Sequence, residues 1–95
     1  MNIGHAIKLC RQQRGCTQSE LAKLAGISIS YLSLLERGER SDPGLSTIEK
    51  VAAALDIPLS LLFFVAADPS ELKGLSHEIV EKLSTAAFDL MKRSE

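Results

Sequence analysis

Residues 17–38 read TQSELAKLAGISISYLSLLERG, and this stretch decides the fold. Thr17 and Glu20 have the three-residue spacing of a capping box, in which the hydroxyl accepts a hydrogen bond from an orphan backbone amide and the carboxylate reaches back to the cap. The box predicts a helix over residues 18–25. The residues expected on its inward side are Leu21, Leu24 and Ala25.

The second half of the same stretch predicts another helix after a sharp reversal. Gly26 permits the positive φ that such a reversal often demands. Ser28 is a good N-cap for a third helix that continues through Leu32 and Leu35 to the residue before Gly38. The stretch therefore predicts a helix, a tight turn and a helix, an arrangement that can present the second helix to the major groove of DNA.

The flanking sequence completes an all-α fold. Apolar residues at helical spacing predict a first helix over residues 3–14. Ser46 and Glu49 form a second capping-box pattern that opens a fourth helix, and the very apolar residues 59–64 predict a short fifth one. We therefore expect a compact five-helix domain over residues 1–67. The fourth helix should bury Ile48, Val51, Ala52 and Leu55.

Residues 68–95 predict a C-terminal amphipathic helix. Apolar residues recur there at steps of three and four, as at the a and d positions of a coiled coil. Two roles remain open, because such a helix can pair two copies of the chain or fold back over the apolar surface of its own domain. The expected dimerisation residues are Leu72, Leu75, Ile79, Leu83 and Leu90, and Ala86 continues the pattern.

The composition fits a globular protein, with 45% apolar and 24% charged residues and a net charge of −1. Residues 1–67 carry seven Lys or Arg against six Asp or Glu, whereas residues 68–95 carry four against six. A DNA contact must therefore come from a local basic patch in the first part. The uncharged apolar run over residues 57–67 is shorter than the roughly 20 residues of a membrane span. With no secretory signal at the start, we expect a cytoplasmic protein without a membrane partner.

The residue types that most often carry catalysis or bind metals are isolated in this sequence. His5 and His77 have no Cys or His at metal-ligand spacing. No nucleophile elbow, P-loop or pair of carboxylates set for acid–base chemistry is present. We therefore expect no catalytic residues, no metal and no cofactor.

An ordered series of residues from Ile3 to about Phe63 resembles the Cro and phage-repressor-like (xenobiotic response element) helix-turn-helix regulators. A lone helix-turn-helix pattern is a weak signal, but the whole series is a strong one. The matching residues are Arg11, Arg14-Gly15-Cys16-Thr17-Gln18, Leu21-Ala22, Ala25-Gly26-Ile27-Ser28, Tyr31-Leu32-Ser33, Leu35-Glu36-Arg37-Gly38, Pro43, Leu45, and Thr47 with Val51-Ala52-Ala53-Ala54-Leu55.

The resemblance implies that the helix from Gln18 abuts the DNA backbone and that the helix from Ser28 is the recognition helix. Gln18 then resembles a phosphate-contacting amide, the alternative being a merely solvated side chain. Tyr31 is either a phosphate-facing hydroxyl or a half-buried packing ring. The expected DNA-binding residues are Thr17, Gln18, Ser28, Ile29, Ser30, Tyr31, Ser33, Leu34, Arg37 and Arg40, the two arginines in phosphate-contacting positions.

Other residues of the series are implied to be structural. Arg11 and Glu36 resemble the family's internal salt bridge, which joins the first helix to the recognition helix. Cys10 and Cys16 stand where the family usually has core leucines, so packing is their expected role, with redox sensing as the alternative.

Taken together, these features predict a transcriptional repressor or controller that binds double-stranded DNA as a homodimer on a palindrome. The base-reading positions are unusual, because serine is permissive and Ile29 and Leu34 can touch only thymine methyl groups or sugars, which favours a contribution from DNA shape. The alternative is a protein-interaction module, such as an antitoxin with a protein partner on its C-terminal helix. Packing of Ile29 and Leu34 against another protein and the negative net charge keep that alternative open.

Overall fold

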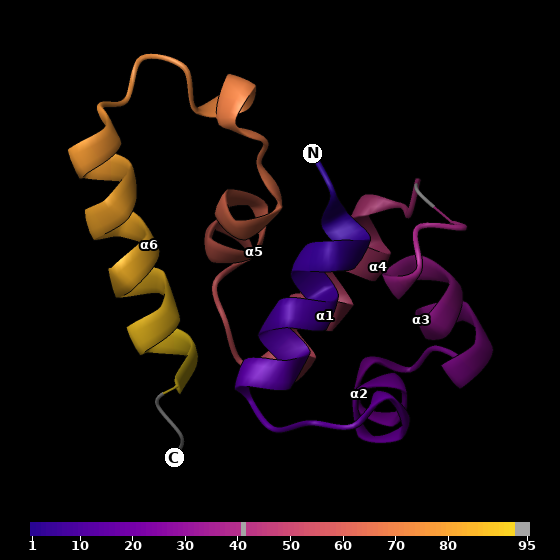
Figure 1. Cartoon of the computed structure of the whole chain (residues 1–95). Coiled ribbons are helices and arrows are strands. Elements are labelled where there is room, and N and C mark those ends of the chain that lie inside the picture. Colours follow the sequence, from indigo (N-terminus) through magenta and orange to yellow (C-terminus); the bar gives the residue numbers. More distant parts are fainter. Residues whose placement is uncertain (41, 93–95) are drawn as a thin grey trace.

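The computed structural model describes residues 1–40 and 42–92 of the chain. This part of the chain is built from helices without strands, so the predicted all-α fold is confirmed. Figure 1 shows helices α1 to α5 gathered into one body, with α6 standing beside α5 on the side away from α3. The helices are α1 Ile3–Gln13, α2 Gln18–Ala25, α3 Ile29–Glu36, α4 Leu45–Leu55, α5 Leu59–Ala66 and α6 His77–Lys92, with a 3-10 turn at Pro69–Leu72 before α6.

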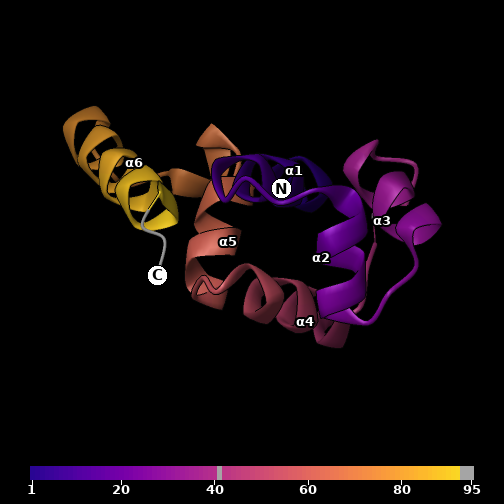
Figure 2. The same ribbon diagram turned by 90° about the horizontal axis from the view of Figure 1, so that it is seen from below.

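The core lies where α1 crosses the other helices of the body. α1 packs against α3 and α5, while α2 packs against α3 and α4. Figure 2 shows the same arrangement from below, with α6 and α3 at opposite ends of the molecule. Burial of this apolar interior is the main favourable contribution to folding. The largest fully buried side chains are Ile7, Cys10, Leu21, Leu32, Leu35, Val51 and Leu62.

The caps predicted for α2 and α3 are present. The Thr17 hydroxyl accepts a hydrogen bond from the Glu20 amide at 3.0 Å, and the Thr17 amide donates to the Glu20 carboxylate at 2.8 Å. The Ser28 hydroxyl accepts from the Tyr31 amide at 3.0 Å. Between the two helices, Gly26 ends α2 with φ 71°. The helix, turn and helix therefore follow from local chemistry that the sequence contains.

The predicted cap of α4 is wrong. The helix begins at Leu45, after Gly44, and no side chain caps it. The Gly44 carbonyl accepts from the amides of Thr47 and Ile48, so Ser46 already lies inside the first turn. The predicted apolar face is nevertheless correct, because Ile48, Val51, Ala52 and Leu55 are all buried.

Leu24 was expected on the inward side of α2, and this expectation is wrong. Leu21, Ala22 and Ala25 are buried, whereas Leu24 is 67% exposed. At about 100° of rotation per residue, Leu24 falls about 100° from the centre of the buried arc. The two alanines let α2 lie close to its neighbours, and the larger leucine is left facing outward.

The C-terminal helix is shorter than its apolar pattern suggests. α6 begins at His77, so Leu72 and Leu75 are not part of it, contrary to expectation. Leu72 ends the 3-10 turn, and Gly74 then adopts φ 97°, a conformation that interrupts a helix. α6 packs against α1 and α5, with Ala87 as its one buried residue among those described. Residues 93–95 of the expected segment lie outside the described part.

Candidate nucleic-acid interface

Helix α3 divides its residues between the core and the surface. Leu32, Leu35 and Glu36 are buried, and they fix the helix against α1 and α2. Ser28, Ile29 and Ser30 are exposed at the start of the helix, and Ile29 keeps 50% of its surface accessible. The other predicted surface residues of this helix, Tyr31, Ser33 and Leu34, are half-buried. The exposed first turn of α3 therefore carries small hydroxyl groups beside one exposed isoleucine.

The hydroxyls that cap α2 and α3 can each still donate one hydrogen bond. Thr17 and Ser28 each use an oxygen lone pair to accept from the backbone of their own helix. A hydroxyl also carries one O–H donor, which this role does not consume. Both residues stand at helix N-termini, where free amides and the helix dipole favour an anion such as phosphate.

A partly buried clamp joins α1, α2 and α3 behind the exposed residues of α3. The guanidinium of Arg11 donates two hydrogen bonds to the Glu36 carboxylate, at 2.8 and 2.9 Å, and a third to the Cys16 carbonyl at 2.9 Å. The side chains of Arg11 and Glu36 are 13% and 2% exposed. The hydrogen bonds to Glu36 raise the pKa of Arg11. The structure thus brings together the two residues that were expected to form an internal salt bridge.

Gln18 belongs to the same clamp, which the sequence did not predict. Its amide nitrogen donates to the Glu36 carboxylate at 3.0 Å, and the side chain remains partly exposed. One amide hydrogen is therefore engaged with α3, while the NH₂ group has a second one. The two partners are eighteen positions apart in the sequence, so there is no local signal for this bond.

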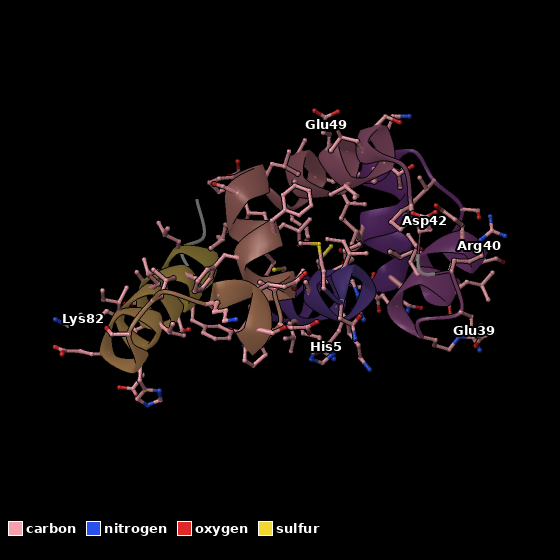
Figure 3. All side chains as sticks on the ribbon, turned by 90° about the horizontal axis from the view of Figure 1, so that it is seen from above. His5, Glu39, Arg40, Asp42, Glu49 and Lys82 are labelled. Carbon is pink, nitrogen blue, oxygen red and sulfur yellow. The ribbon has the colours of Figure 1, made fainter. Side chains whose placement is uncertain are left out.

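The turn after α3 carries the two predicted phosphate-contacting arginines, and both are exposed. Arg37 pairs with the Glu39 carboxylate at 3.3 Å, and the Arg40 guanidinium lies over the ring of Tyr31, 5.6 Å from its centroid. Figure 3 shows Glu39, Arg40 and Asp42 at the same end of the molecule. The basic patch is therefore small and has acidic residues beside it.

Arg14 was matched to the family series without a specific role, and the structure gives it one. Its guanidinium donates to the carbonyls of Leu55 at 2.9 Å and Asp56 at 2.7 Å. These carbonyls lie at the C-terminal end of α4, where a positive charge is favourable. The arginine therefore fixes α1 to α4 and supports the body behind the α2–α3 pair.

The cysteines have the environment of packing residues. Both thiols are free. Burial raises the pKa of Cys10 to about 11, and burial also raises the pKa of the half-buried Cys16, with Glu20 adding to the effect. Because the thiolate is the reactive form, these environments argue against the redox alternative.

Two kinds of feature are absent from the described residues. No group of three or more His, Cys, Asp or Glu side chains in residues 1–40 and 42–92 is placed to hold a metal ion. Among the helices of the same ranges, none combines the length and the apolar character that crossing a membrane requires.

Comparison with known proteins connects this geometry to a large group of regulators. Residues 7–62 match the family model described as Helix-turn-helix. The chain is 43% identical over 60 residues to the HTH-type transcriptional regulator SinR of Bacillus subtilis (strain 168), a match that covers 63% of this chain and 54% of the relative. It is 39% identical over 95 residues to the immunity repressor protein of Bacillus phage phi105, which covers all of this chain and 61% of the relative.

A further relative comes from another organism. The HTH-type transcriptional regulator SutR of Escherichia coli (strain K12) is 43% identical over 58 residues, which cover 61% of this chain and 32% of the relative. The chain thus spans 32% to 61% of the length of these three proteins. The similarity to SinR and SutR is confined to about two thirds of this chain, whereas the similarity to the phage repressor includes α6.

Proposed function

The chain belongs to the helix-turn-helix family, whose model matches more than half of its residues, and on this premise we propose that it is a sequence-specific DNA-binding regulator of transcription. The relatives reported above are named as regulators or as a repressor, which supports a regulatory and non-enzymatic role. The observation that carries the proposal is the position of α3, which presents Ser28, Ile29 and Ser30 outward while the clamp of Arg11, Glu36 and Gln18 fixes it from behind.

The proposed contacts fall into two groups. Gln18, Arg37 and Arg40 contact the phosphates. The hydroxyls of Thr17 and Tyr31 belong to this group and do not read bases. The α3 face reads base edges, with the serine hydroxyls as permissive donors and acceptors and with Ile29 and Leu34 against thymine methyl groups. Arg37 must exchange its Glu39 partner for a phosphate, an exchange that costs little because exposed ion pairs contribute only about 0–1 kcal/mol.

We propose further that the regulator binds a palindrome as a homodimer. One helix-turn-helix unit makes few base contacts, and two units related by a two-fold axis reach half-sites about one DNA turn apart. In this proposal residues 1–67 carry the DNA contacts and residues 68–95 carry the pairing element, and the protein acts in the cytoplasm, where its DNA lies. Ile79, Leu83 and Leu90 support the pairing role, since each remains more than two fifths exposed on α6.

Selection of bound duplexes from a randomised DNA pool tests the proposal. The winning duplex is then titrated with salt beside an unrelated duplex of equal length. We expect a palindromic winner that binds about 10³-fold tighter than the control duplex. An absence of enrichment, together with weak binding that disappears at moderate salt, would contradict sequence-specific binding.

Matched alanine variants separate the two groups of contacts. Arg37→Ala and Arg40→Ala should weaken binding to every duplex alike and reduce its salt dependence, because they remove phosphate contacts. Ser30→Ala and Ser33→Ala should instead change the preference among duplexes. An equal loss on all duplexes for the serine variants would remove these residues from the base-reading group.

A second candidate function is a protein-interaction module that retains the fold. The observation that favours it is the exposed apolar surface near the α2–α3 turn, where Leu24 and Ile29 are 67% and 50% exposed. An apolar interface of this kind depends weakly on salt, whereas phosphate binding weakens steeply. The salt titration described above therefore distinguishes the two functions.

A further inference from the structure

One side of α6 is apolar and keeps much of its surface exposed. Ile79, Leu83 and Leu90 are 46%, 43% and 46% exposed, and Ala86 is exposed beside them. Their spacing of four, three and four residues places them along one stripe of the helix. Ala87, which is 4% exposed, marks a different side, the one that meets the body. The stripe Ile79, Leu83, Ala86 and Leu90 therefore keeps a large part of its apolar surface accessible in the single chain.

The stripe continues into an apolar groove between α5 and α6. A hollow of about 300 Å³ lies there, lined by Pro58, Leu61, Phe64, Leu83, Ala87 and Leu90 among others. Leu83 and Leu90 belong to both the stripe and the groove. A second apolar helix laid along the stripe would thus contact α5 as well as α6, which is how helices pack in a bundle.

Charges on the outer edge of the stripe indicate which helix fits. Lys82 and Asp89 line the opposite edge from Ala87, are seven residues apart, and carry opposite charges. In an antiparallel pair of identical helices, the same edge of each helix meets its counterpart, and the order of residues is reversed. Lys82 then comes beside Asp89 of the second copy, and the contact occurs twice by symmetry. A parallel pair would instead direct this edge toward the edge of Ala87, which is covered by the body.

We propose that the α5–α6 groove is occupied by α6 of a second copy of this chain, running antiparallel, with Lys82 of each copy paired to Asp89 of the other. This inference rests on the proposed homodimeric regulator and specifies how its two copies meet. It also keeps the pairing surface away from α3, because Figure 3 shows Lys82 and Arg40 at opposite ends of the molecule. Two copies joined through α6 therefore leave both recognition helices uncovered.

Charge reversal on the whole chain tests the pairing without DNA. Sedimentation equilibrium gives the dimer dissociation constant of the wild type, Lys82→Glu, Asp89→Lys and the double variant. Each single reversal turns two attractive contacts into two repulsive ones, so we expect the dissociation constant to rise about tenfold or more. The double variant exchanges the two charges and should return to within about threefold of the wild type.

Matched controls carry the same charge changes elsewhere. Lys50→Glu and Glu49→Lys alter exposed residues of α4 and should leave the dissociation constant unchanged. Lys82→Glu also removes the ion pair of Lys82 with Glu78 at 3.2 Å, so circular dichroism must show that α6 keeps its helicity. Asp89→Lys leaves that pair intact and gives an independent reading of the same contact.

Three results would overturn the inference. The wild type could stay monomeric throughout the measured concentrations, or the single reversals could leave the dissociation constant unchanged. The third such result is a double variant whose dissociation constant is no lower than those of the single variants. None of them removes the proposed DNA binding by α3, although a monomeric wild type would also count against the proposed homodimer. Binding of the single variants to a duplex with only one half-site reports on the α3 face alone, and it should match the wild type. If neither the wild type nor the variants bind any selected duplex, the regulator itself is the idea that fails.

Discussion

Glu36 is the residue on which the recognition geometry depends most. Its carboxylate receives two hydrogen bonds from Arg11 on α1 and one from Gln18 on α2, while its own backbone belongs to α3. A bidentate arginine pair fixes direction as well as distance. The angle between α2 and α3 is therefore set by a polar cluster as well as by apolar packing, and Gln18 couples a proposed phosphate contact to that cluster.

Removal of the arginine from this cluster should be costly. In Arg11→Met the Glu36 carboxylate, whose side chain is 2% exposed, loses its charged partner. We expect a loss of about 3–5 kcal/mol in the free energy of unfolding, measured by urea denaturation. The matched control Arg37→Ala breaks an exposed ion pair with Glu39 and should change stability by less than about 1 kcal/mol. Similar losses in both variants would contradict the structural role of the clamp.

Glu20 gives a prediction about pH. The hydrogen bond from the Thr17 backbone amide lowers the pKa of Glu20 below its ordinary value of 4.5. A lowered pKa means that this group stabilises the fold above pH 4.5 and that its contribution disappears as the pH falls through the lowered value. The difference in unfolding midpoint between the wild type and Glu20→Gln should therefore be constant near neutral pH and shrink in acid. A difference that grows in acid would contradict the capping box as the source of the shift.

At the scale of helices, the close approach of α1 to α3 depends on Gly4. A β-carbon at this position would lie 1.8 Å from the Leu35 carbonyl oxygen, which belongs to the backbone of α3. Gly4→Ala should therefore push the two helices apart and lower the free energy of unfolding by about 1–3 kcal/mol, although alanine is the better helix former.

The control for this variant is another glycine in an open position. Gly44→Ala has no neighbour within 4 Å of the added carbon, and its φ of −68° suits any residue. Its cost is limited to a weaker N-cap, which we expect to stay within about 1 kcal/mol. Thermal denaturation measures the loss of stability in both variants. Equal losses for Gly4→Ala and Gly44→Ala would contradict the close approach of α1 to α3 as the cause.

Local chemistry explains which elements were predictable. The capping box at Thr17 and the cap at Ser28 involve partners three residues away, so the sequence contains the whole interaction. The same pattern at Ser46 gave a wrong prediction. The amides of Thr47 and Ile48 already donate to the Gly44 carbonyl, so the helix begins before Ser46. The outward position of Leu24 and the close contact at Gly4 depend on neighbouring helices. In the sequence, the signal for the close approach of α1 to α3 was a glycine, Gly4, inside an expected helix.

The predictability of the site follows the same division. The Arg11–Glu36 pair came from the family resemblance, and the structure brings its two residues together. The hydrogen bond from Gln18 to Glu36 joins residues eighteen positions apart, and no periodicity in the sequence predicts it. Which residues contact DNA remains a prediction, for which the outward face of α3 and the exposed arginines supply the supporting geometry.

At the scale of the whole molecule, the proposed DNA-binding surface on α3 and the proposed dimerisation surface on α6 lie at opposite ends. Figures 1 and 2 both show α6 on one side of the body and α3 on the other. α6 meets the body on α1 and α5, and hollows of about 300 and 200 Å³ flank Ala87 in this contact. The packing of α6 on its own chain is therefore thin, as expected of a helix whose other side is proposed to bind a second copy.

This thin contact predicts that α6 can be detached without unfolding the rest. Ala87→Asp places a carboxylate where the wild-type side chain is 4% exposed, and the cost of burying that charge should displace the helix. Hydrogen exchange should then show loss of protection for the amides of residues 77–92, with α1 to α5 still protected. Thr85→Asp adds the same charge on the exposed side of α6 and should leave exchange unchanged. If Ala87→Asp instead lowers protection equally in all six helices, α6 is part of one cooperative unit, and the proposed boundary after residue 67 has no physical meaning.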